Sequence, residues 1–142
     1  MASVPVARHW AVEVSRSFGL DAEAVGNVAL LVTELVTNAV VHGRSEFTLE
    51  LAFEASGPDR GTVHVEVADG DSRLPRMDKA DAEALGGRGL ALVSSLSDAY
   101  GVRELDFGKA VWCELAVEVA ATAEVPGGHA REAAEHRARA SI

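Results

Sequence analysis

The sequence predicts an α+β fold, a two-layer α/β sandwich in which helices cover one face of a mixed, mostly antiparallel sheet. Three observations lead to this prediction. Two segments with helical periodicity come first, the apolar period then changes to two, and a third helical segment separates two predicted hairpins. The order helix, helix, hairpin, helix, hairpin places the strands side by side and gathers the helices on one face.

The two N-terminal helices are predicted from their caps and apolar spacing. Ser3 is suited to cap the first helix and Gly19 to end it, and Asp21 is suited to cap a second helix that ends at Gly43. The first helix is expected to bury a stripe of residues spaced by four, and the second a wider arc. The stripe comprises Val6, Trp10, Val14 and Phe18, and the arc comprises Val25, Val28, Val32, Leu35, Val36 and Ala39.

Two hairpins follow from alternating apolar residues. Alternation predicts strands over 46–54 and 62–67 around a turn at 56–61, and a second hairpin over 98–119 with its turn at 106–108. A third helix opens at Gly89, after a polar stretch of about twenty residues that is longer than most loops. Trp10 and Trp112 are both expected to be core anchors.

The length of 142 residues suits one domain, which we place at 1–120, and 121–142 is predicted to be a flexible C-terminal tail. Gly127-Gly128 interrupts this tail, and 130–140 is rich in Ala, Glu and Arg without an apolar stripe, so only some helical tendency is expected there.

Composition excludes several classes of function. Thirteen Lys and Arg against twenty-two Asp and Glu give a formal charge of −9, which repels nucleic acid. Neither a signal peptide nor a membrane span is expected, so the cytoplasm is the expected location. The single cysteine, Cys113, is expected to be a core thiol, because it can neither form a disulfide within the chain nor build a zinc site.

Glu34 and Asn38 are the unusual residues of the second helix. They lie four residues apart in a segment that is apolar almost all round, so their Cβ atoms are roughly 6 Å apart on one face. Buried polar groups need partners. Either Glu34 bonds to Asn38 or to a basic residue such as Arg8 or Arg44, or the two side chains provide oxygen ligands for Mg²⁺.

Two later segments could hold the rest of an anionic ligand. Asp69 ends a predicted strand, and Gly87-Arg88-Gly89-Leu90 opens a helix whose N–H groups and dipole favour phosphate. Each feature alone is more typical of an ordinary turn or helix start. Their combination with Glu34 and Asn38 favours a nucleotide site.

These segments resemble the motifs of the GHKL, or Bergerat-fold, ATPases, and most closely those of bacterial anti-sigma-factor serine/threonine kinases with a histidine kinase-like ATPase domain. The resemblance covers roughly 3–115. TELVTNAVVHG is similar to the family's N-box, VADGDSRLP and GGRGLALVSSLSDAYG to its two glycine boxes, and GKAVWCEL to its last strand.

The resemblance implies a role for each matching residue. Glu34 would be the general base, Asn38 the Mg²⁺ ligand, and Asp69 the partner of the adenine amine. The remaining candidates for contact with ATP are His42, Asp71, Gly87, Arg88, Gly89, Leu90 and Lys109. His42 is also suited to cap the end of its helix, Arg88 to stay solvated, and Lys109 to sit in a turn.

The implied function is that of a regulatory kinase. Such an enzyme transfers the γ-phosphate of ATP to a serine of an antagonist protein, an anti-anti-sigma factor, and sequesters a sigma factor. A homodimer is a further expectation from the resemblance.

Two alternatives stay open. Asp71 replaces the family's usual Gly and Ala110 a frequent Thr, which would suit a non-catalytic ATP-binding or protein-docking module with a weakened nucleotide pocket. The ATP-binding half of a sensor histidine kinase would need a separate phospho-accepting chain.

Overall fold

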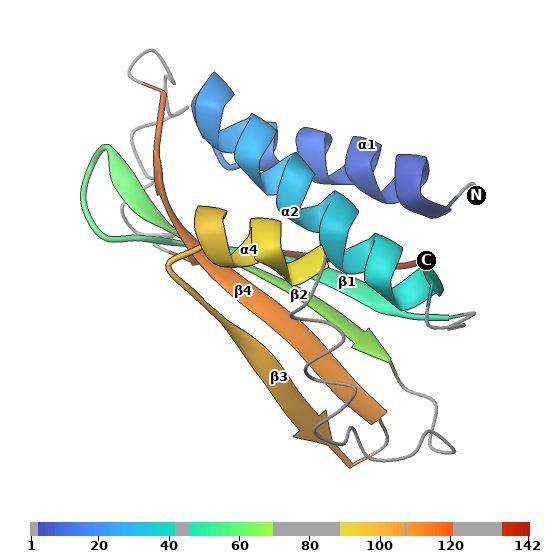
Figure 1. The fold of residues 1–142 in the computed structure, drawn as a ribbon. Helices are drawn as coiled ribbons and strands as arrows, with labels where there is room; N and C mark the ends of the chain where they lie inside the picture. Colours follow the sequence, from blue (N-terminus) through green and yellow to red (C-terminus); the bar gives the residue numbers. More distant parts are fainter. Residues whose placement is uncertain (1–2, 42–45, 70–88, 107, 121–134) are drawn as a thin grey trace.

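The computed structural model describes residues 3–41, 46–69, 89–106, 108–120 and 135–142. In this part of the chain, helices cover one face of a single sheet (Figure 1). The predicted two-layer α+β sandwich is therefore confirmed. The helices are α1 (Ser3–Ser17), α2 (Ala22–Val41) and α4 (Gly89–Leu96). The strands are β1 (Thr48–Ala55), β2 (Arg60–Asp69), β3 (Ala99–Leu105), β4 (Gly108–Glu118) and β5 (Glu135–Ser141).

The strands lie in the order β3-β4-β2-β1-β5, and every pairing between them is antiparallel. Both predicted hairpins are present, as β1 with β2 and β3 with β4. Alternation sets the two faces of the sheet. Val63, Val65 and Val67 of β2 are buried under the helices, so the residues between them and their cross-strand partners lie on the opposite, open face.

The helix α2 lies between α1 and α4 and forms the centre of the helical layer (Figure 1). It is capped as predicted, because the Asp21 carboxylate accepts a hydrogen bond from the Ala24 N–H at 2.8 Å. All six residues of the predicted arc are buried. Leu31, which lies outside the predicted arc, is also fully buried, whereas Leu30 and Val41 are 40% and 70% exposed.

By length and composition alone, α2 is apolar enough to cross a membrane, and among the described helices it is the one that passes this test. The core helix of a folded domain passes the same test, so length and composition alone give weak support for a membrane span. Nine of its residues are buried within the fold, and the helix packs against α1, α4, β2 and β4.

The buried stripe of α1 differs from the prediction. Its fully buried residues are Ala7, Ala11 and Ser15, and Val6 is 56% exposed. Small residues where α1 packs against α2 let the two helices approach closely. The buried stripe therefore lies one position later than predicted, and the larger side chains flank it. Trp10, Val14 and Phe18 pack against the core from its sides. Gly19 follows with a φ of 85°, the left-handed conformation that ends a helix.

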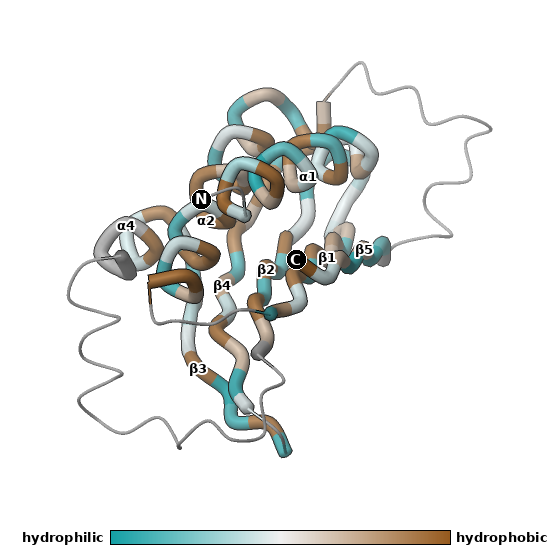
Figure 2. The backbone as a smooth tube through the Cα atoms, turned by 90° about the vertical axis from the view of Figure 1, so that its right-hand side faces the viewer, coloured by the Kyte–Doolittle hydropathy of each residue, from teal (hydrophilic) through white to brown (hydrophobic). Residues whose placement is uncertain are grey.

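The prediction of a flexible tail over 121–142 is wrong for its last residues. Glu135–Ser141 forms β5, which pairs with β1 along its whole length and makes the edge of the sheet. Beyond it, the backbone of Ile142 exchanges two hydrogen bonds with that of Phe47. Figure 2 shows β5 in mainly hydrophilic colours, which explains why apolar periodicity missed it. Residues 121–134 lie outside the described part of the chain.

Trp112 is also misplaced by the sequence prediction. It pairs with Glu66 and Gly101, and both pairings put it on the open face of the sheet rather than in the core. The indole covers the backbone of Gly101, where an added Cβ would lie 3.1 Å from the ring. From Val111 onward, the buried residues of β4 are Cys113, Leu115 and Val117, which alternate with residues of the open face.

Candidate functional site

The candidate site starts with Glu34 and Asn38 in the C-terminal half of α2. Both side chains are half-buried, although the helix around them is packed into the core. The Asn38 amide nitrogen is completely buried and has no hydrogen-bond partner. Within the described residues, Glu34 likewise makes no hydrogen bond or ion pair, with Asn38, with Arg8 or with any other group.

This arrangement argues against the purely structural explanation for the pair. A buried amide left without a partner costs about 1–3 kcal/mol, and native proteins contain few such groups. Arg44, the other basic residue considered, lies outside the described residues. An orphaned amide beside an unpartnered carboxylate fits a site that a ligand completes, and the amide oxygen with the carboxylate forms a donor set suited to Mg²⁺.

The remaining elements of the site meet at the same end of the molecule. In Figure 1, β2 ends and α4 begins on the side where α2 ends. Asp69 is the last residue of β2 and pairs in register with Lys109, the second residue of β4. Lys109 already interacts with another residue. The structure thus places the paired ends of β2 and β4 on the side of the molecule where α2, the helix that carries Glu34 and Asn38, ends.

Ala110 lies next to this pair and is fully buried. Its cross-strand partner is Ala68 of β2, and the alternation of both strands places the two methyl groups on the open face of the sheet, away from α2. The resemblance would favour a hydroxyl at the position of Ala110.

Gly89 and Leu90 form the first turn of α4, as predicted, and α4 packs against α2. A helix that begins at this point directs its unpaired N–H groups toward the preceding chain. Four candidate contacts are not placed by the structure. They are His42, Asp71, Gly87 and Arg88, which lie outside the described residues.

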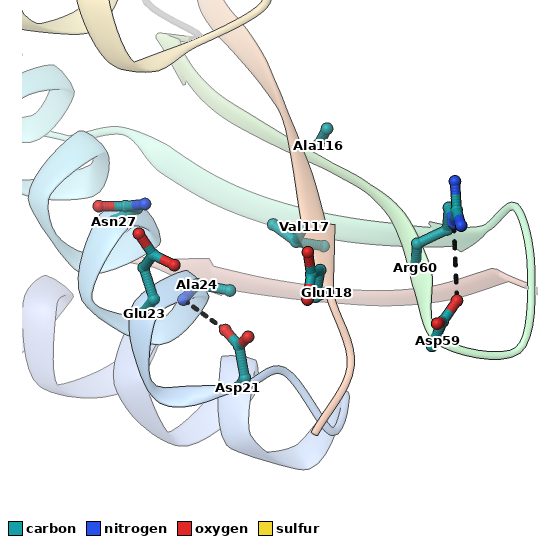
Figure 3. A pocket seen from close by; sticks show the side chains of 9 residues that line it. All are labelled: Asp21, Glu23, Ala24, Asn27, Asp59, Arg60, Ala116, Val117 and Glu118. Carbon is teal, nitrogen blue, oxygen red and sulfur yellow. Dashed lines mark hydrogen bonds and ion pairs between the residues drawn. The ribbon is translucent and has the colours of Figure 1, made fainter. Parts of the chain in front are cut away.

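The spacing that marks Glu34 and Asn38 occurs a second time on α2. Glu23 and Asn27 are also four residues apart and lie eleven residues earlier, about 16 Å along the axis. Figure 3 shows them lining a polar pocket of about 500 Å³ at the N-terminal end of α2. The sequence contained this repeat, and the spacing alone would have revealed it.

The pocket at Glu23 and Asn27 is unsuited to a triphosphate. Four of its lining residues are acidic, namely Asp21, Glu23, Asp59 and Glu118. Its single basic residue, Arg60, is paired with Asp59 at 3.5 Å (Figure 3). Since these carboxylates repel phosphate, the two Glu and Asn pairs are not equivalent, and the N-terminal pair provides a matched control. No group of three possible metal ligands is found among the described side chains.

Comparison with known families identifies one match. The model of the family described as "Histidine kinase-like ATPase domain" matches residues 1–115. This range includes the three described helices, the strands β1, β2 and β3, most of β4 and all the candidate residues. No curated protein matches the chain.

Proposed function

The chain belongs to the histidine kinase-like ATPase domain family, a family of GHKL-type ATP-binding domains, and from this membership we propose that it is a serine/threonine kinase of the anti-sigma-factor type. It transfers the γ-phosphate of Mg-ATP to a serine of an antagonist protein and, in another state, sequesters a sigma factor. The proposal places the chain in the cytoplasm.

The observation that carries the proposal is the buried, unpartnered amide of Asn38 one turn from an unpartnered Glu34. In the proposed site, the Asn38 side-chain oxygen is a ligand of Mg²⁺. When bound, Mg²⁺ supplies positive charge next to the phosphate oxygens.

Glu34 acts on the substrate hydroxyl. Phosphoryl transfer depends mainly on positioning and on charge stabilisation, so the protein needs one group that orients the nucleophile and accepts its proton. A carboxylate without an internal partner is available for this step, whereas one held in an ion pair is not. Asp69, at the end of β2, accepts a hydrogen bond from the adenine amine in this proposal.

The proposal separates binding from transfer. Glu34→Ala should retain ATP affinity and lose transfer of label from γ-labelled ATP to a serine of a candidate antagonist protein. Glu23→Ala, at the other end of the same helix, should change neither. If Glu34→Ala transfers label as fast as the unaltered chain, Glu34 is not the base.

The second candidate function, a docking module with a weakened nucleotide pocket, is supported by Ala110, which is fully buried and has a methyl group where the resemblance would favour a hydroxyl. It predicts no heat on titration with millimolar Mg-ATP. Restoring the hydroxyl with Ala110→Thr should then recover binding, whereas a functional kinase already binds without this change.

A further inference from the structure

The edge strand β5 is a strand against its local preference. Its Glu, Arg and Ala residues favour helices, and Glu and Ala are depleted in strands. It pairs with β1 and has no strand on its other side. From His136 to Ser141, none of its side chains is fully buried. A strand whose sequence conflicts with its place in the fold belongs to the least stable part of a sheet, so β5 is suited to leave it.

The side of β5 that faces the helical layer makes few apolar contacts. His136 stacks with Phe18 and Phe53, at centroid distances of 6.0 and 6.2 Å. The next two residues on this side are Ala138 and Ala140, which stay partly exposed. A larger apolar side chain at either position would remove more surface from water. The helical side of this edge can therefore bind a strand with bulkier residues more tightly than it binds β5.

The open side of β5 is held by charge. Arg139 lies opposite Glu50 and donates a hydrogen bond of 3.0 Å to one of its oxygens, and Arg137 lies 3.9 Å from the same oxygen. The Glu50 side chain is only 14% exposed, whereas both arginines are more than half exposed. A strand that brought no cation to this edge would cover the carboxylate without neutralising it. The edge therefore selects for a basic residue opposite Glu50.

The backbone of β1 adds a requirement that is independent of side chains. The backbone of Phe47 exchanges two hydrogen bonds with that of Ile142. Because the residues of an antiparallel pair alternate, the N–H and C=O groups of every second residue after Phe47 also point at β5, namely those of Leu49, Leu51 and Phe53. Without β5 these groups form an open sheet edge, to which an extended peptide segment can add as a strand.

We infer that the outer edge of β1 is a docking site for an extended, basic segment of a partner protein, and that β5 occupies this site as a removable internal substitute. The partner segment pairs antiparallel with β1, places an arginine or lysine opposite Glu50, and has larger apolar residues where β5 has Ala138 and Ala140. It keeps the charge contact that holds β5 and adds the apolar contacts that β5 lacks. Since β5 competes at the high effective concentration of an attached segment, a displacing strand needs these added contacts. The inference does not depend on nucleotide binding.

Hydrogen exchange of the unaltered chain tests whether β5 leaves the sheet while the rest stays folded. Alternate amides of β1 face β5 and β2, so one strand provides both the test and its control. After correction for intrinsic rates, the amides that face β5 should exchange about tenfold or more faster than those that face β2. Equal protection of the two sets would overturn the inference, because β5 would then open only with the whole fold. The first set is Leu49, Leu51 and Phe53, and the second is Glu50, Ala52 and Glu54.

A disulfide between β1 and β5 provides the locked control. Thr48 and Ser141 form a pair next to the hydrogen-bonded pair of Phe47 and Ile142, so they do not hydrogen-bond to each other and their Cβ atoms lie close together. Thr48→Cys with Ser141→Cys, in a Cys113→Ala background, should form this disulfide on oxidation. The difference between the two sets of amides should vanish in the oxidised protein and return on reduction. A difference that persists in the oxidised protein would show that it does not report the release of β5.

Peptides test the chemistry of the partner segment. The probe is a fluorescent peptide with the sequence of residues 135–142 in which valine replaces both alanines, and its control has glutamine in place of both arginines as well. In fluorescence anisotropy, the probe should bind the full chain about tenfold or more tightly than the control, and Glu50→Gln should abolish this preference. The oxidised, locked chain should bind neither peptide. No binding of the probe, equal binding of both peptides, or binding to the locked chain would contradict the proposed site.

Discussion

Replacing Asn38 with leucine should stabilise the protein in the absence of nucleotide. Leucine has the same branched shape at Cγ but no N–H group. The buried Asn38 amide has no hydrogen-bond partner, and an unsatisfied buried donor costs about 1–3 kcal/mol. Removing it should raise the free energy of unfolding by about 1 kcal/mol, the lower end of that range, because the side chain is only half-buried. For a chain of this length, that corresponds to a rise in Tm of about 3 °C.

The assay is urea and thermal unfolding of purified Asn38→Leu without ATP, followed by circular dichroism. The matched control is Asn27→Leu, in the polar pocket at the other end of α2, which should change stability by less than about 0.5 kcal/mol because its amide is not an orphaned buried group. A loss of about 1 kcal/mol or more in Asn38→Leu would show that the amide is satisfied in solution, and the argument for a ligand at this position would fail.

Four further outcomes follow from the packing of the fold and from charges on the sheet. Gly61→Ala should destabilise the protein by more than about 1 kcal/mol, because the new Cβ would lie 2.4 Å from a backbone oxygen of β1. Gly26→Ala should stabilise the protein by about 0.5–1 kcal/mol, because a Cβ added at this helix position meets no atom within 4 Å. If urea titrations gave the same change in stability for Gly61→Ala and Gly26→Ala, this account of the packing would be refuted. Burial, and to a smaller extent the nearby charge of Glu114, raises the pKa of Cys113 to about 12. The thiol should therefore resist iodoacetamide at pH 8 until the chain unfolds. Rapid labelling of the folded protein would contradict the burial of Cys113. Burial works to raise the pKa of Glu66, but its bonds to His64 and Arg103 outweigh this and hold the pKa below 4.5. The ionised Glu66 carboxylate therefore stabilises the fold above pH 4.5, and this effect is lost as the pH falls through the lower pKa of the folded state. Glu66→Gln should consequently lose less stability in acid than the unaltered chain. If the stability of both proteins fell equally with pH, this prediction would be disproved.

Most of the fold could be predicted because local signals agree with tertiary structure in its central elements. Asp21 caps α2 as expected, and alternating valines set β2 under the helices. The edge strand β5 could not be predicted in this way. Its Ala, Arg and Glu residues favour helices, and it is held by pairing with β1 and by the contacts of its arginines with Glu50.

The error at Trp112 has a different origin. Size and apolar character suggested a core residue, but in a strand the position relative to its neighbours decides the face. Cys113 and Leu115 are buried, so Trp112 has to face the opposite side. Alternation along β4 was sufficient to find this, and the preference for burying large aromatic residues obscured it.

For the site, the sequence identified Glu34 and Asn38 of α2, but it left open whether neighbouring residues satisfied their polar groups. That question depends on three-dimensional contacts, and the structure answers it for Asn38 and for Glu34. The polar stretch between Asp69 and Gly89 carries several candidate contacts outside the described residues, so the roles of Asp71, Gly87 and Arg88 stay predictions.

The most direct test of the central claim is calorimetric titration with ATP, with and without Mg²⁺, of the unaltered chain, Asn38→Ala and Asn27→Ala. We expect Mg²⁺ to strengthen ATP binding in the unaltered chain and in Asn27→Ala, and this Mg²⁺-dependent gain to vanish in Asn38→Ala. Equal affinities with and without Mg²⁺ in the unaltered chain, or an undiminished gain in Asn38→Ala, would contradict the assignment of Asn38 as the metal ligand.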